Sequence, residues 1–216
     1  MKCSQVALFL LACALFGVAH AQTVVYDNTT TSLDNNHPLL PEWLDDSDEC
    51  GDEVWLAGTD RAVTEFKLFM TYRGTAPGTF DARLRFREFD EVNAVPSTVI
   101  YDGGLVEDVP IISGVGEYAF AVPNVVVPDH LVWTIQLYDR QGFVGEFGPS
   151  YYNPSTIGFS DDWMWLSGDG IGWTPYSWGG DPYANFAAQL TAVPEPATWL
   201  ALAVGAALLR RRRRSR

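Results

Sequence analysis

Apolar and polar residues alternate along most of the chain between residues 22 and 192. Residues 80–87 read Phe-Asp-Ala-Arg-Leu-Arg-Phe-Arg, so apolar side chains are two positions apart and charged side chains fill the positions between them. A period of two places the two kinds of side chain on opposite faces, which predicts a half-buried antiparallel strand. The same alternation predicts strands at residues 65–73, 131–138 and 186–190. Shorter runs predict further strands at residues 54–57, 98–101, 117–122 and 157–160.

Glycine- and proline-containing segments separate these runs. They mark turns at residues 73–78, 102–104, 127–129 and 148–149. No window of ten residues in this part of the chain has the period of an amphipathic helix. About nine short strands joined by turns predict an all-β fold, a single antiparallel β-sandwich of jelly-roll type. Residues 167–182 are rich in glycine and end on Pro182, so we expect a long loop there rather than a pair of strands.

The N-terminal segment, residues 1–21, has the pattern of a secretory signal peptide. Lys2 supplies the positive charge, residues 6–18 form an apolar helical segment, and Ala19 and Ala21 flank the predicted cleavage position. Such a helix spans about 20 Å, which is short of a hydrocarbon core of about 30 Å, so a permanent membrane anchor is disfavoured. A lipoprotein signal is a further alternative, because Leu-Leu-Ala precedes a cysteine within this segment. We expect signal peptidase to cut after Ala21.

The C-terminal segment, residues 193–216, combines three features in a fixed order. The first is Pro194-Glu195-Pro196, in which the two prolines keep the chain extended. The second is an apolar run at residues 197–209, which predicts a short membrane helix. The third is a basic cluster made of Arg210, Arg211, Arg212, Arg213 and Arg214. Because such a cluster stays on the cytoplasmic side of a membrane, the body of the protein must lie outside.

This arrangement resembles the PEP-CTERM sorting signal, which consists of a Pro-Glu-Pro motif, a short membrane segment and an arginine cluster. The resemblance implies processing near the motif by an exosortase, and release or attachment of the protein outside a bacterial cell. It implies nothing about the activity of the body, and an ordinary C-terminal membrane anchor is the alternative. The expected domains are a signal peptide at residues 1–21, a β-sandwich at residues 22–192 and a sorting signal at residues 193–216.

The charge of the body excludes one class of partner. The whole chain has a formal net charge of −13, but residues 22–192 carry 7 basic and 26 acidic side chains, a net charge of −19. A body this acidic repels phosphate backbones, so no nucleic-acid partner is expected. Cys50 is the one cysteine of the body, which excludes an intrachain disulfide there.

Known catalytic patterns do not occur in the body. A Gly-x-Ser-x-Gly motif is missing, and the two histidines, His37 and His130, are expected to face solvent. Neighbouring carboxylates raise the pKa of a thiol such as Cys50 and suppress thiolate chemistry. Paired carboxylates can hydrolyse glycosidic bonds, but no motif selects a pair. We therefore expect no enzymatic activity, and a glycoside hydrolase is the least favoured alternative.

One acidic segment, residues 45–53, is the best candidate for a metal site. Its side chains Asp45, Asp46, Asp48 and Asp52 could supply several of the six to eight oxygen ligands that calcium takes. The spacing does not match an EF-hand, and solvated surface is the alternative interpretation of an acidic run. No other cofactor is expected.

Aromatic residues crowd into residues 159–178 among several glycines. Trp173, Tyr176 and Trp178 lie in the part that is rich in glycine and proline, so we expect their rings to be exposed and able to stack on sugars. Trp163 and Trp165 are expected to cover one face of the core instead. A core role for the whole cluster is the alternative.

These features predict an exported, exosortase-sorted protein of the bacterial cell surface or extracellular matrix, with a structural or adhesion role. Its expected partners are signal peptidase, an exosortase-like enzyme, the membrane during sorting, and an exopolysaccharide. The alternative function is a carbohydrate-binding module that uses the aromatic loop.

Overall fold

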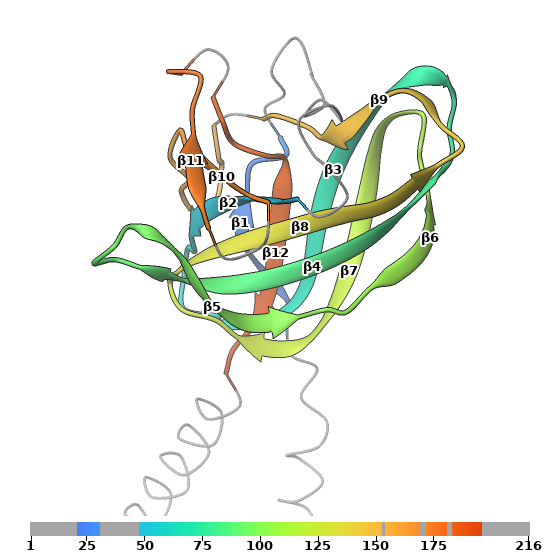
Figure 1. Ribbon diagram of the computed structural model, residues 1–216. Coiled ribbons are helices and arrows are strands. Elements are labelled where there is room, and N and C mark those ends of the chain that lie inside the picture. The colour runs from blue at the N-terminus through green and yellow to red at the C-terminus, as the bar shows by residue number, and fades with distance from the viewer. Residues whose placement is uncertain (1–20, 31–47, 153, 169–171, 181–182, 196–216) are drawn as a thin grey trace, which may run out of the picture.

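The computed structural model describes residues 21–30, 48–152, 154–168, 172–180 and 183–195. In these residues the chain forms twelve strands, all of them paired antiparallel, and no helix. The strands build two sheets that pack face to face (Figure 1), which confirms the predicted all-β sandwich. The predicted signal-peptide helix and the predicted membrane helix lie outside the described residues. Within the described part, no helix has the length and apolar character needed to cross a membrane.

The first sheet has five strands. Its order is β1 (Thr23–Asp27), β12 (Ala188–Val193), β3 (Ala62–Ala76) and β7 (Gly114–Val126). The fifth strand, β9 (Val144–Pro149), pairs with the C-terminal half of β3, beyond the point where β12 ends.

The second sheet has seven strands. Its order is β11 (Thr174–Tyr176), β10 (Met164–Ser167), β2 (Glu49–Trp55), β8 (His130–Gln141), β4 (Thr79–Asp90) and β5 (Val95–Asp102). The seventh strand, β6 (Val106–Pro110), pairs with the N-terminal part of β4. In Figure 1 the long strands β4 and β8 of this sheet cross in front of β3 and β12 of the first.

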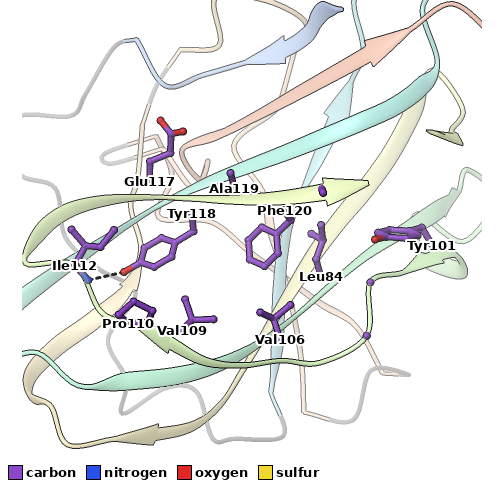
Figure 2. A pocket seen from close by; sticks show the side chains of 13 residues that line it. Leu84, Tyr101, Val106, Val109, Pro110, Ile112, Glu117, Tyr118, Ala119 and Phe120 are labelled. Carbon is purple, nitrogen blue, oxygen red and sulfur yellow. Dashed lines mark hydrogen bonds between the residues drawn. The ribbon is translucent and has the colours of Figure 1, made fainter. Parts of the chain in front are cut away.

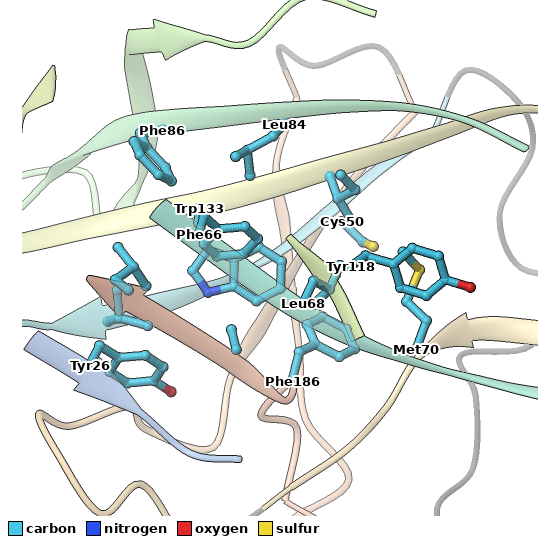
Figure 3. Packing of buried hydrophobic residues seen from close by; sticks show 14 of the residues in the cluster. Tyr26, Cys50, Phe66, Leu68, Met70, Leu84, Phe86, Tyr118, Trp133 and Phe186 are labelled. Carbon is cyan, nitrogen blue, oxygen red and sulfur yellow. The ribbon is translucent and has the colours of Figure 1, made fainter. Parts of the chain in front are cut away.

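The core lies between the two sheets (Figure 3). Its centre consists of the apolar side chains that alternate along β3 and β8, all of which are buried: Phe66, Leu68, Met70, Tyr72, Leu131, Trp133, Ile135 and Leu137. The ring of Trp133 packs 5.0 Å from Phe66 and 5.9 Å from Phe186, measured between ring centroids. The period-two pattern therefore identified the inward-facing side of these strands correctly.

Three local predictions are wrong. The predicted turn at residues 148–149 lies inside β9, where Gly148 and Pro149 pair with Thr71 and Met70 of β3. Residues 167–182 do not form only a loop, because β11 pairs with β10 as a short hairpin. Pro175 is tolerated there because β11 is the last strand of its sheet and needs no donor on its outer side. Residues 157–160 form two isolated bridges instead of a strand. Gly158 has a φ of 74° between them, and a Cβ there would lie 2.5 Å from the Trp55 carbonyl oxygen, so the chain turns away at this point.

Candidate ligand-binding face

The outer face of the seven-stranded sheet carries an unusual number of buried polar groups. On β8, Val132, Thr134 and Gln136 point away from the core, yet all three are buried. Side chains of the neighbouring strands lie across them, since Thr134 donates a hydrogen bond to Glu49 on β2 and Arg85 on β4 donates to Gln136 at 3.2 Å. A layer of polar side chains therefore covers this face.

Three arginines at alternate positions of β4 form the centre of this layer. We call Arg83, Arg85 and Arg87 the arginine row. It contains three of the seven basic residues of the body, and the two-residue spacing directs all three side chains to the outer face. The row therefore concentrates positive charge on one face of an otherwise acidic protein.

Glu49 of β2 is the shared acceptor for two arginines of the row. Arg85 Nη1 donates to Glu49 Oε2 at 2.6 Å, and Arg87 Nη2 donates to both carboxylate oxygens at 3.1 Å. Glu49 is 1% exposed, so this is a buried ion-pair network rather than a surface salt bridge. It connects β2 to β4 across the intervening strand β8.

Asp102, at the end of β5, completes the row on the more exposed side. Arg83 donates to both oxygens of Asp102 in a bidentate pair, and Arg85 Nε donates to Oδ2 at 3.2 Å. The Arg83 guanidinium holds the pKa of Asp102 well below its ordinary value, and Asp102 in turn raises the pKa of Arg83. Tyr138 interacts with Arg83 and donates to Gln136, so donors and acceptors lie side by side here.

Trp173 covers the other end of the arginine row. Its ring lies over Arg87, with the guanidinium carbon 4.8 Å from the ring centroid, which is a cation–π contact. The ring is half-buried, so one part of it remains available to a ligand. The sequence predicted an exposed Trp173 ring able to stack on sugars; the ring is half-buried, and sugar binding by it stays a prediction.

The other two predicted sugar-stacking rings lie elsewhere. Tyr176 and Trp178 contact each other at 5.0 Å, and Trp178 contacts Tyr151 at 4.8 Å, again between centroids. Both rings pack against the core and are half-buried, so the expectation of a single exposed cluster with Trp173 is wrong. Glycines near these rings allow the chain to fold back onto the sandwich, so the rings pack against it and are not held out in solvent.

Trp163 and Trp165 also differ from the prediction. Trp165 is buried, but on the outer face, where it lies beside Phe89 and its Nε1 donates to Glu53 Oε2 at 3.2 Å. Trp163 is 46% exposed and is not part of the core. The intervening Met164 provides the inward-facing side chain, because neighbouring strand residues point to opposite faces.

His130 does not face solvent, contrary to the prediction. Its Nε2 lies 2.7 Å from Glu53 Oε1 and its Nδ1 lies 2.6 Å from Glu91 Oε1. Its ring stacks on Trp55 at 4.1 Å with an interplanar angle of 13°. Burial raises the pKa of Glu53, although His130 and Trp165 oppose that effect. The cluster connects β2, β8 and the turn after β4, which is a structural role.

The acidic segment is only partly a surface loop. Asp52 is fully buried on β2, and its carboxyl group accepts hydrogen bonds from the Phe186 backbone at 3.1 Å and from Ser160 at 3.3 Å. Burial raises the pKa of Asp52, and burial likewise raises the pKa of Cys50 beside it. Asp52 therefore cannot join a solvent-facing calcium site. Asp45 and Asp46 lie outside the described residues, and in the described part no group of three His, Cys, Asp or Glu residues could hold a metal ion.

A second candidate surface is an apolar pocket at one edge of the sandwich (Figure 2). It has a volume of about 490 Å³ and lies between β6 of one sheet and β7 of the other. Val106 and Val109 line one side, and Tyr118 and Phe120 line the opposite side. The Tyr118 hydroxyl accepts a hydrogen bond from the Ile112 backbone at 2.9 Å and closes one end. Among the described residues that line the pocket, Glu117 is the charged one, and Figure 2 shows its carboxylate on the other side of β7, so the pocket suits apolar groups.

The body of the protein is thus a small acidic β-sandwich, and the outer face with the arginine row and the apolar pocket are its two candidate binding surfaces. Comparison with protein families identifies the PEP-CTERM protein-sorting motif at residues 192–214. The motif shows that this is an exported, cell-surface-directed bacterial protein, sorted by an exosortase and associated with the membrane through its C-terminus. Pro194 and Glu195 directly follow β12, whereas Pro196 and the arginine cluster lie outside the described residues. No curated protein and no solved structure matches the chain.

Proposed function

We propose that the β-sandwich is a non-catalytic adhesion module that binds a polysaccharide of the extracellular matrix. The site is the exposed half of the outer face, formed by the arginine row, Asp102, Tyr138 and Trp173. One observation carries the proposal: the bidentate Arg83–Asp102 pair is accessible, with side-chain exposures of 37% and 31%, and it adjoins the buried network of Arg85, Arg87 and Glu49. This placement combines access for a ligand with a rigid support.

The chemistry of the face suits sugar hydroxyl groups. A carboxylate accepts and a guanidinium donates hydrogen bonds, and the Arg83–Asp102 pair offers both within one planar unit. Trp173 adds a flat apolar ring, on which the C–H face of a sugar can stack. Glu49 and Gln136 hold Arg85, and Arg85 in turn holds Asp102, before any ligand arrives, so little conformational entropy of these side chains is lost on binding.

The charge balance favours a neutral polysaccharide. Asp102 offsets one positive charge of the arginine row and Glu49 another, so the site has little net charge of its own. The body as a whole carries −19 over residues 22–192, which repels polyanions at low ionic strength. A neutral chain with neighbouring hydroxyl groups avoids this repulsion and uses the paired donors and acceptors.

The test is binding of the exported protein to the matrix polysaccharide of the producing cells, measured by isothermal titration calorimetry. We expect Arg83→Ala and Trp173→Ala to weaken binding at least tenfold, because each removes one recognition element. Lys67→Ala is the matched control, since Lys67 forms a surface ion pair with Glu117 and both residues lie on the five-stranded sheet, away from the arginine row. No binding by the wild type, or equal binding by all three variants, would overturn the proposal. Release of reducing sugar would overturn the non-catalytic part of it.

A further inference from the structure

In the five-stranded sheet, the path β1-β12-β3-β7 has one covered end and one open end, and the short strand β9 also pairs with β3 alone among the described residues. At β1, the carbonyl of Val25 accepts a hydrogen bond from Ala57 at 2.8 Å, and Asp27 forms a bridge with Ile157. At the opposite edge, β7 pairs with β3 alone among the residues that the structure describes. An open edge strand is a template for another strand, and proteins usually protect such edges with charges, prolines or bulges.

The register shows which backbone groups of β7 point toward the open side. The Phe69 amide of β3 donates to Ala187 at 2.9 Å, and the Phe69 carbonyl accepts from Ser150 at 2.9 Å, so both groups point away from β7. Phe69 and its β7 partner Glu117 therefore form a non-hydrogen-bonded antiparallel pair. In such a pair the N–H and C=O of Glu117 point away from β3, toward the open side of β7. By the two-residue alternation, the same holds for Ala119 and Ala121.

This part of β7 has little protection against pairing. Residues 114–122 contain a single charged side chain, Glu117, and that side chain is paired with Lys67 of the same sheet at 2.8 Å. Val115 and Val126 near the two ends of the strand are 43% and 49% exposed. Pro123 is the first protective residue, and it limits any added pairing to the segment before it.

The apolar pocket lies along the same edge. Figure 2 shows Tyr118 and Phe120 pointing from β7 toward the pocket, whereas Glu117 and Ala119 point to the other side of the strand. The core is thus left open where the sheet ends. A further strand beside β7 would place its own inward-facing side chains next to Tyr118 and Phe120 and would cover this opening.

We propose that a second copy of the chain pairs with β7, antiparallel, about a two-fold axis that passes near Ala119. Pairing of the β7 edge with itself about a two-fold axis uses the same surface of both copies, so it gives a closed dimer rather than a fibre. The outward groups of Glu117, Ala119 and Ala121 from each copy would form about six hydrogen bonds across the axis.

The register about this axis avoids a charge conflict. With Ala119 opposite itself, Glu117 of one copy lies opposite Ala121 of the other, and the two glutamates are not neighbours. Tyr118 lies opposite Phe120 of the other copy, on the pocket side. The two pockets therefore close against each other with aromatic side chains between them.

The overall charge determines how this dimer responds to salt. Two bodies of −19 each repel one another, so added salt strengthens a dimer that is held by backbone hydrogen bonds and apolar contacts. An association held by salt bridges would weaken under the same conditions. The direction of the salt effect thus distinguishes edge pairing from attraction between charged patches.

The test is sedimentation velocity of the exported protein over a concentration series at low and at moderate salt. We expect a monomer–dimer equilibrium whose dissociation constant falls as salt rises. Ala119→Pro removes the outward N–H without removing a bond to β3, and we expect the dissociation constant to rise at least tenfold. Ala119→Val is the matched control, since it keeps the N–H and is expected to dimerise like the wild type.

Three results would overturn the proposal. They are a monomer at every concentration and salt, an unchanged dimer in Ala119→Pro, and assemblies larger than a dimer. Hydrogen exchange provides a second measurement that does not depend on the proline variant. The amides of Glu117, Ala119 and Ala121 are expected to exchange more slowly as the wild-type concentration rises, and a rate independent of concentration contradicts edge pairing.

Discussion

Replacing Glu49 by glutamine tests whether the ion-pair network on the outer face is a buried one. Glutamine has nearly the same shape as glutamate but no negative charge. In the variant, Arg85 keeps Asp102 as a partner, whereas Arg87 loses the carboxylate that accepts its Nε and Nη2 groups. The positive charges of the two arginines then remain close together, with less compensation, on a covered face.

The structure indicates a large effect. Glu49 is 1% exposed and the side chain of Arg87 is 7% exposed, so neither charge is well solvated. Removing one partner of a buried ion pair costs about 3–5 kcal/mol, because the other charge is left uncompensated. For a body of this size, about 1 kcal/mol lowers the melting temperature by roughly 2–4 °C, so we expect Glu49→Gln to lose about 6–20 °C.

The assay is urea unfolding for the free energy and a thermal scan for the melting temperature, both followed by tryptophan fluorescence, with circular dichroism as a check on two-state behaviour. Asp129→Asn is the matched control, since Asp129 pairs with Arg61 at 2.6 Å but its side chain is 83% exposed. Arg61 is buried, but without Asp129 it keeps the backbone carbonyls of Ala57, Asp60 and Gly58 as acceptors, and the Asp129 carboxylate is already solvated, so this variant should unfold almost like the wild type. If Glu49→Gln loses no more than Asp129→Asn, the network is effectively solvated and the reasoning is wrong.

Other changes test the core, the aromatic residues and the sorting motif. Burial raises the pKa of Asp52, so the stability that its protonated carboxyl group contributes is complete below the unfolded pKa of about 3.9 and is lost as the pH rises through the folded pKa. Asp52→Asn should therefore reduce the fall in melting temperature between pH 4 and pH 8. A variant whose melting temperature depends on pH as the wild type's does would contradict this. Trp165→Ala should lower the free energy of unfolding by about 3–5 kcal/mol, whereas Trp163→Ala should change it by no more than about 0.5 kcal/mol. Equal losses would show that the two tryptophan rings do not differ in burial as described. Replacing Pro194 and Pro196 by alanine should leave unprocessed protein in the membrane fraction on immunoblots, and normal maturation would contradict the role of the prolines.

Alternation along the chain was sufficient to predict the long central strands. In β3 and β8 the inward positions carry large apolar residues over seven consecutive positions, and burial of that face determines which side points inward. Short strands such as β6 and β9 were not predicted. Their burial patterns show mostly exposed residues in β6 and a half-exposed run in β9, so little apolar signal exists to detect.

The acidic half of β2 shows why the candidate site could not be predicted in full. Glu49 and Glu53 in an acidic run have the appearance of solvated surface. They are buried because Arg85, Arg87 and His130 reach them from strands that are distant in the sequence. Three arginines at alternate positions of one strand were visible as a polar face, but only the strand order shows that this face meets a carboxylate.

The arginine row and the open edge of β7 are different surfaces of the sandwich, and their combination has a measurable consequence. The row lies on the outer face of one sheet, whereas the edge belongs to the other, so the proposed dimer through β7 would leave both proposed ligand-binding faces free. Two faces on one polymer gain avidity of about 10²–10⁴ over a single face when the geometry allows both to bind. Ala119→Pro should therefore weaken binding to long polysaccharide chains but leave the affinity for a short oligosaccharide unchanged, as measured by calorimetry with both ligands. Equal loss for the two ligands would mean that the substitution disturbs the binding face itself, and no loss for either would mean that the two surfaces act independently.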